Sequence, residues 1–166
     1  MLKSRYCLSI ISFFLFFSHL CFAETQLGLR AFTVTPNSKI EITSNSMIFN
    51  SKTNMTEFID DVVVNYGKFT LKARSLSILQ PADTSEKNPL EFSAKGPLEI
   101  SNGENFIYGD SAFYSGNAQE LTVSGNVNLI NGNNKIFGDT LILSLNNGLA
   151  KISGSVKTIL GPIEGD

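Results

Sequence analysis

Catalysis or metal binding in this chain would depend on a few acidic residues that stand beside one another or beside glycine. Asp60 and Asp61 are adjacent, and two carboxylates can do acid–base work when both flank one bond of a substrate. Adjacent side chains of a strand point to opposite faces, so this pair is not expected to do so. Gly109-Asp110 and Gly138-Asp139 would suggest calcium, but Ca²⁺ needs at least about six oxygen ligands and one Asp per turn supplies too few. We therefore expect no catalytic residue, no metal site and no cofactor, and we interpret these pairs as bends in which Asp bonds to the turn.

The other nucleophilic or metal-ligating side chains lie close to the N-terminus. They are the two cysteines, Cys7 and Cys21, and the single histidine, His19. Nucleophilic catalysis needs a base beside the nucleophile, and the chain beyond residue 23 has neither His nor Cys. The formal net charge of -2 and the scattered lysines also argue against a nucleic-acid surface, which would show a basic stripe. These features disfavour an enzyme and a nucleic-acid partner.

Residues 1–23 have the layout of a secretory signal peptide. A short basic start precedes an apolar run over residues 8–20, and Ala23 is a small residue at the end. The run is shorter than the roughly 20 apolar residues that span a membrane comfortably. We predict cleavage after Ala23 and export of a mature domain at 24–166. Lipidation at Cys21 and an uncleaved N-terminal anchor are the alternatives.

A sequence motif of apolar residues, glycines and asparagines recurs along the rest of the chain. Residues 125–139 match residues 96–110, which lie 29 positions earlier, and residues 60–74 match again without a gap. A further copy begins at Gly154. A fixed period near 29 residues is typical of stacked supersecondary units that bury their apolar faces against their neighbours. The sequence therefore predicts an elongated array, and a function that depends on a long surface or groove.

The repeated motif itself predicts antiparallel strands. Val127 and Leu129 alternate with polar residues, and Asn131-Gly132 follows as a tight-turn signal. Each copy is expected to supply about four short antiparallel segments, and helix is expected to be marginal. The step from the first copy to the second is longer than the others, and we assign the excess to an inserted surface loop at 81–89.

The apolar positions of these strands have two interpretations. Inward-facing Val, Leu, Ile and Phe usually form a closed core, whereas an array one repeat wide can leave an apolar seam between its sheets. Such a seam, without a polar catalytic group, would suit a lipid or an acyl chain. The candidates for this lining are Phe49, Phe58, Val62, Val64, Leu98, Ile100, Tyr114, Val123, Val127 and Leu129.

The order of these motifs resembles a known family. Residues 40–45, 56–67 and 71–74 resemble the opening of the periplasmic lipopolysaccharide-transport proteins of the LptA/OstA family. Residues 121–127 and 136–139 are similar to the family's later L-x-G-N and I-x-G-D motifs. Asn45 and Arg74 stand where the family usually has Asp, and Asp60 stands where it usually has Gly. These departures fall at turns, so they concern local turn geometry more than the fold.

The resemblance implies a slightly twisted antiparallel β-jellyroll with open ends, which holds lipid A acyl chains inside. It also implies a periplasmic lipopolysaccharide carrier that stacks head to tail into a bridge. The partners implied are an LptC-like inner-membrane protein and an LptD-like outer-membrane protein. A membrane-anchored LptC-like component shares the fold and is the first alternative. A structural or adhesive β-repeat protein without a lipid groove is the second.

Two regular strands near the ends of the array are expected to be its assembly edges. A stack of open repeats ends in strands with unpaired backbone groups, which can add to the sheet of another copy. The residues expected at these edges are Ile40 and Ile42 on one side and Val156, Thr158 and Leu160 on the other. We therefore predict head-to-tail self-association by strand addition.

Overall fold

The computed structural model describes residues 39–79 and 91–162. The predicted signal peptide and the predicted loop at 81–89 lie outside the described residues. The predicted all-β class is confirmed, because the described parts of the chain form strands and no α-helix. Nor do these residues include a helix with the length and hydropathy of a membrane span.

The described residues form ten strands, of which the six central ones are long and the two at each end are short. They are β1 (Ile40–Thr43), β2 (Ser46–Asn50), β3 (Met55–Tyr66), β4 (Phe69–Leu79), β5 (Glu91–Ser101), β6 (Asn105–Ser115), β7 (Glu120–Asn131), β8 (Asn134–Ser144), β9 (Ala150–Ser153) and β10 (Lys157–Ile159).

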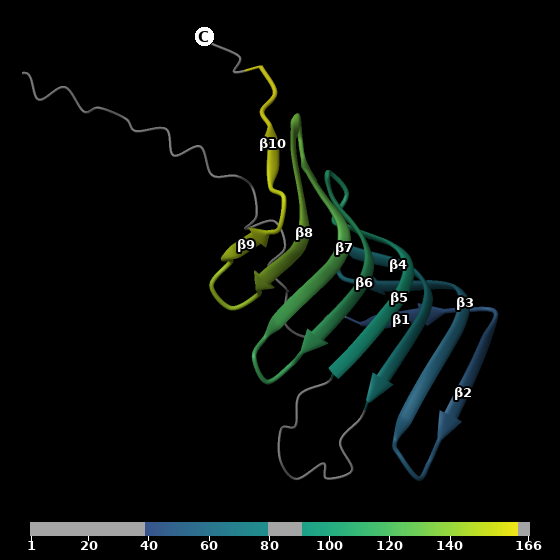
Figure 1. The fold of residues 1–166 in the computed structure, drawn as a ribbon. Helices are drawn as coiled ribbons and strands as arrows, with labels where there is room; N and C mark the ends of the chain where they lie inside the picture. The colour runs from purple at the N-terminus through teal and green to yellow at the C-terminus, as the bar shows by residue number, and fades with distance from the viewer. Residues whose placement is uncertain (1–38, 80–90, 163–166) are drawn as a thin grey trace, which may run out of the picture.

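These strands make one antiparallel sheet that follows the order of the chain. The path runs β1-β3-β4-β5-β6-β7-β8-β10, while β2 also pairs with β3 and β9 also pairs with β8. The sheet therefore begins with β1 and β2 and ends with β9 and β10, and successive hairpins stack along one direction (Figure 1). This is the elongated array that the repeat predicts.

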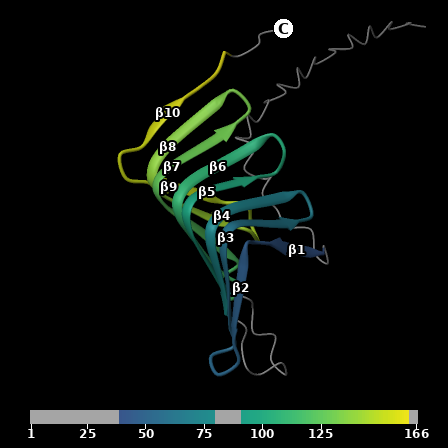
Figure 2. The ribbon, with the colours of Figure 1, turned by 90° about the vertical axis from the view of Figure 1, so that its right-hand side faces the viewer.

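Each long strand bends once near its middle, and the bend divides the sheet into two arms (Figure 2). Every long pair shifts its register at this point by a β-bulge, as between Ile59 and Val62 on β3 or between Ser124 and Val127 on β7. We call the segments that contain β1, β10 and residues 62–72, 98–109 and 127–138 the first arm. The second arm contains β2, β9 and residues 55–59, 75–79, 91–95, 111–115, 120–124 and 140–144. The four short segments expected in each copy are thus two continuous strands, each with a bend.

The repeated Gly and Asp residues form this corner. Gly125 and Asn126 both have positive φ, +79° and +47°, and the side-chain amide of Asn126 donates a 2.8 Å hydrogen bond to the carboxylate of Asp110. A bulge with residues in this conformation sharpens the bend of the strand that carries it. The interpretation of Gly-Asp as a bend with an Asp hydrogen bond agrees with this geometry, but the bend lies within strands and not between them.

The first copy keeps the corner although its residues differ. Asp60 and Asp61 have φ of +60° and +52°, the conformation that glycine adopts in the later copies. The side-chain amide of Asn45 donates a 2.9 Å hydrogen bond to Asp61, and its backbone N–H donates to the carbonyl of Asp60. Asp tolerates the left-handed region better than most residues because its short side chain bonds locally. The departures from the family pattern therefore leave the bend intact.

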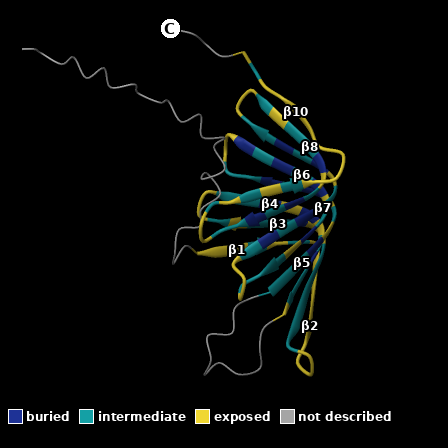
Figure 3. Cartoon of the chain, turned by 60° about the vertical axis from the view of Figure 1, so that its left-hand side comes forward, coloured by how far each residue is buried: buried dark blue, intermediate teal, exposed yellow. Residues whose placement is uncertain are grey.

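The core lies inside the angle between the two arms and is most complete toward β6, β7 and β8 (Figure 3). Its buried apolar residues come from both arms: Val62, Leu71, Ala73, Leu76, Ala94, Leu98, Ile100, Ile107, Ala112, Leu121, Val123, Val127, Leu129, Leu141 and Leu143.

Candidate functional site

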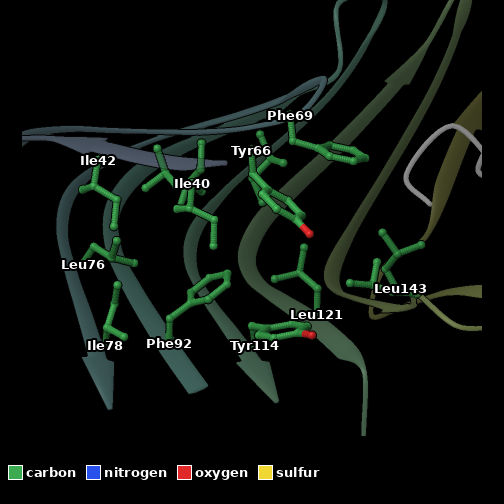
Figure 4. A pocket seen from close by; sticks show the side chains of 14 residues that line it. Ile40, Ile42, Tyr66, Phe69, Leu76, Ile78, Phe92, Tyr114, Leu121 and Leu143 are labelled. Atoms are coloured by element: carbon green, nitrogen blue, oxygen red, sulfur yellow. The ribbon is translucent and has the colours of Figure 1, made fainter. Parts of the chain in front are cut away.

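An apolar groove opens between the arms on the side of β1 and β3. Its volume is about 450 Å³, within the usual range for ligand sites of roughly 300–1,000 Å³. Side chains from both arms project into it (Figure 4). The residues that line it are Ile40, Ile42, Val64, Tyr66, Phe69, Leu71, Leu76, Ile78, Phe92, Ile100, Tyr114, Leu121, Leu143 and Leu145.

The first arm supplies one wall through two rows of cross-strand neighbours. Ile42 lies opposite Val64, and Val64 lies opposite Leu71, which in turn faces Ile100. Residues directly opposite in an antiparallel pair project to the same face, so this row forms a continuous apolar stripe. Ile40, Tyr66 and Phe69 form a second row, nearer the hairpin turns.

The second arm supplies the facing wall in the same way. Ile78 lies opposite Phe92, Phe92 opposite Tyr114, and the row continues through Leu121 to Leu143. The rings of Phe92 and Tyr114 stack with centroids 5.2 Å apart and an angle of 24° between their planes. This row extends farther along the stack than the lining of the first arm.

The groove closes toward the end of the stack that carries β9 and β10. Ile107 and Leu129 of the first arm are fully buried, as are Val123 and Leu141 of the second. At the other end Ile42, in the same row as Ile107 and Leu129, is only partly buried and lines the groove. The lining of the first arm therefore comes from β1 to β5, whereas Tyr114, Leu121 and Leu143 continue the lining of the second arm into β6 to β8.

The ten residues predicted to line a groove fall into different places. Val64, Ile100 and Tyr114 line the groove, and Phe58 packs against the core beside the lining residue Leu76. Phe49 lies on the edge strand β2 with 56% of its surface exposed. The other five are buried in the core: Val62, Leu98, Val123, Val127 and Leu129.

Distance from the corner separates lining from core. Val62, Leu98 and Val127 stand directly beside the bulges, where the two arms are closest together. Four lining residues that were not predicted from the sequence stand farther along the strands or near their ends: Tyr66, Phe69, Ile78 and Phe92. Leu129 lies in the same row as Ile100 and differs from it in its position along the stack. The signals that separate lining from core are therefore the position relative to the Gly-Asp motif and the position along the stack, and not alternation.

The groove offers apolar contact and very little polar chemistry. Its described lining residues carry no charged side chain, and the polar side-chain atoms among them are the hydroxyls of Tyr66 and Tyr114. Burial raises the pKa of the Tyr114 phenol, and the nearby Tyr66 adds to the effect. Among the described residues, no three His, Cys, Asp or Glu side chains gather as metal ligands would. The arrangement suits non-covalent binding of an apolar ligand.

Exposed apolar side chains gather at the two ends of the sheet. Ile40, Met47, Ile48 and Phe49 are exposed at the end formed by β1 and β2. Leu149, Val156, Ile159 and Leu160 are exposed at the end formed by β9 and β10. The predicted assembly residues therefore lie at or beside the two edge strands, with Val156 and Leu160 flanking β10. Ile40 and Ile42 also line the groove, so the groove reaches this edge.

Comparison with solved structures shows the fold. A crystal structure of LptH from Pseudomonas aeruginosa, described as the LptA homologous periplasmic component of a lipopolysaccharide transport device, aligns with a TM-score of 0.66. The alignment covers 75% of this chain and 96% of LptH at 13% sequence identity, so the likeness concerns the fold. No curated protein sequence matches the chain. The predicted β-jellyroll architecture is confirmed.

Comparison with family models identifies the family. The model for the LptA/(LptD N-terminal domain) LPS transport protein matches residues 41–149, which include β2 to β8 and most of β1. The match extends over more than half of the sequence and includes both arms and the groove. The chain therefore belongs to the LptA/LptD N-terminal domain family of lipopolysaccharide transport proteins.

Proposed function

We propose that this protein is a periplasmic carrier that holds the acyl chains of lipopolysaccharide in the groove between its arms. The observation that supports this most directly is the groove itself, which is open and apolar and has no charged residue in its described lining. Each methylene moved from water into such a lining gains about 0.8 kcal/mol, so several acyl carbons provide useful affinity without any ionic contact. Family membership and the fold shared with LptH support the same assignment.

Photo-crosslinking from adjacent positions of one strand tests the groove. Phe92 faces the groove, whereas Ser93 on the same strand points to the opposite face of the sheet. A photoreactive phenylalanine at 92 is expected to capture lipopolysaccharide, and the same group at 93 is expected to capture little. Equal capture from both positions would contradict the proposal. Leu129 provides a second comparison, because its burial predicts weak capture unless the arms separate.

We also propose that copies stack head to tail, so that the groove continues from one protein to the next. The path from β1 to β10 contains eight strands, each antiparallel to its neighbour. Because this number is even, β10 runs opposite to β1. Thus β10 of one copy can pair in antiparallel fashion with β1 of the next without turning the second copy around.

The backbone groups at the two edges have matching directions. Antiparallel pairs alternate between hydrogen-bonded and non-bonded residues, and each residue directs its N–H and C=O to one side. The Asn102 N–H donates to the Asn105 carbonyl across the β5–β6 turn. We follow this alternation from strand to strand, starting at this bond. By this count the backbone N–H and C=O of Thr158 point away from β8, and those of Ile42 point away from β3.

A single register satisfies both arms. Pairing Thr158 with Ile42 of the next copy joins two residues with free backbone groups and keeps the inward row continuous. In the second arm, the inward residue Ile152 then meets Met47 of the next copy. This arrangement repeats the one-residue bulge that separates the arms in every strand pair within the chain. An LptC-like or LptD-like partner, which the family resemblance implies, would add to the free edges in the same way.

Engineered cysteines test this register, because the chain beyond residue 23 has no cysteine of its own. Residues directly opposite in an antiparallel pair stand about 5.5 Å apart, within the range of a disulfide. Thr158→Cys combined with Ile42→Cys should give covalent ladders on oxidation. Thr158→Cys combined with Glu41→Cys, whose side chain points to the other face, should not. Ladders from the second pair and not from the first would refute the register.

A proline substitution tests whether strand addition causes assembly. Thr158→Pro removes the N–H that points away from β8, so it should reduce oligomers while the monomer stays folded. Ile159→Pro removes an N–H that points toward β8 and is expected to loosen β10 itself. A wild-type protein that remains monomeric at high concentration, with and without lipopolysaccharide, would contradict head-to-tail stacking.

A further inference from the structure

Among the described residues that line the groove, two tyrosines supply the polar side-chain atoms, and the other side chains are hydrocarbon. Tyr66 belongs to the first arm and Tyr114 to the second, so the two rings approach the groove from opposite walls. Figure 4 shows both hydroxyl oxygens directed to the same side, toward Leu121 and Leu143. The polar atoms of the lining are therefore concentrated in one place.

The hydroxyl of Tyr114 is not required for packing. Its neighbours on the adjacent strands are Phe92 and Leu121, which carry no polar atoms, and its ring stacks on Phe92. No hydrogen bond joins this hydroxyl to another described residue. A phenylalanine would fill the same space and make the same stacked contact. The hydroxyl is not among the described polar atoms that are buried without a partner, so it stays open to water or to a ligand in the groove.

We propose that Tyr114, with Tyr66 beside it, recognises a hydroxyl substituent on a bound acyl chain. This inference rests on the proposed acyl-binding function of the groove. A phenol can donate a hydrogen bond to a carbonyl or a hydroxyl and can also accept one from a hydroxyl. Such a contact fixes how deep the chain sits, since hydrocarbon alone is free to slide along an apolar wall.

The surroundings favour a neutral oxygen over a charged group. The part of the lining that the structure describes has no Lys or Arg to compensate a carboxylate or phosphate, and an unpaired charge in an apolar site is strongly disfavoured. The raised pKa of the Tyr114 phenol has the same cause, because burial disfavours the phenolate. The head group of an amphiphile therefore stays outside, and the tyrosines contact the oxygen atoms that lie along the chain.

The test compares two probes that differ by one oxygen, tetradecanoate and 3-hydroxytetradecanoate, bound to the purified protein. Calorimetry measures the binding. Tyrosine emission is a second signal, because the chain has no tryptophan that would mask it. A single hydrogen bond of about 0.5–1.5 kcal/mol predicts that the wild type prefers the hydroxylated chain by about 2- to 12-fold. Tyr114→Phe should abolish this preference, so that the two probes bind the variant with equal affinity. Tyr108→Phe, on the outer face of β6, should retain the preference.

Two results would overturn the inference, and they differ in what they mean for the groove. Equal affinity of the wild type for the two probes, or a preference that survives in Tyr114→Phe and in the Tyr66→Phe, Tyr114→Phe double variant, overturns the recognition and leaves the groove as a lipid site. Failure of the wild type to bind either probe overturns the acyl-binding function and the recognition together. A circular dichroism spectrum like that of the wild type shows that Tyr114→Phe is folded.

Discussion

The corner between the arms gives the sharpest mutational test, because two glycines of β5 and its turn share a positive φ but differ in the space around them. Gly96 and Gly103 have nearly the same φ, +102° and +96°, so alanine suffers similar backbone strain at both positions. A Cβ at Gly96 would lie 2.5 Å from the Cβ of Arg74, whereas a Cβ at Gly103 would have nothing within 4 Å. Gly103→Ala is therefore a matched control for Gly96→Ala.

The expected magnitudes follow from these distances. Positive φ in a residue with a side chain costs of order 1–3 kcal/mol, and this term is shared by both variants. Forcing extra atoms into a close-packed place costs a further 1–3 kcal/mol or so, and this term applies to Gly96→Ala alone. The entropy that alanine removes from the unfolded chain is also shared. We expect Gly96→Ala to be less stable than Gly103→Ala by about 2 kcal/mol.

Urea denaturation followed by circular dichroism measures this difference. At about 2–4 °C per kcal/mol for a domain of this size, the melting temperatures should also differ by about 4–8 °C. Arg74 can move only together with the backbone of β4, because the contact is with its Cβ. Equal destabilisation of the two variants would show that the corner has spare room, and would refute close approach at the bulge as the reason for glycine at 96.

Three further predictions concern the core, the tyrosine and the N-terminus. Leu141→Ala, in the closed part of the core, should cost about 2–5 kcal/mol in the free energy of unfolding. Ile78→Ala, in the open groove, should cost clearly less, and equal costs would contradict the division into groove and core. Because burial raises the folded-state pKa of Tyr114, its contribution to stability is full below about pH 10 and is lost as the pH rises through the folded pKa. Wild type should therefore lose more stability than Tyr114→Phe in alkaline urea melts, and a parallel loss would refute this. Protein exported to the periplasm should begin at Glu24 by intact mass, whereas retention of residues 1–23 would favour the membrane-anchored LptC-like alternative.

The sequence predicts the strands and their stacking well because both depend on local pattern. Alternation around Val127 and Leu129 identifies an inward face, and the 29-residue period fixes which residues become neighbours on adjacent hairpins. The bulges are harder to predict, since Gly125-Asn126 has the composition of a turn between two strands. Whether such a phrase ends a strand or bends it depends on pairing with the neighbouring strand, which is a tertiary property.

The division between groove and core was less predictable for the same reason. Val127 and Ile100 have the same inward orientation and similar chemistry, and both are buried, yet only Ile100 also lines the groove. The distance of each residue from the bulge decides this, and that distance depends on how the strands pair. Alternation can therefore identify the inward face of a strand, but it cannot locate the point at which the two arms move apart and leave a groove.

The uneven width of the groove sets a requirement on any transport through it. The lining of the first arm comes from β1 to β5, whereas Ile107 and Leu129 of the same arm are fully buried. An acyl chain that enters near β1 and leaves near β10 must separate these side chains, and the apolar surface so exposed is covered again by the chain itself. The exchange of one apolar neighbour for another carries little net cost, because the burial lost between the arms is regained against the ligand. A closed core at one end is therefore compatible with passage, provided that the arms can open at the bulges, and capture of lipopolysaccharide from position 129 in the crosslinking experiment would report that opening.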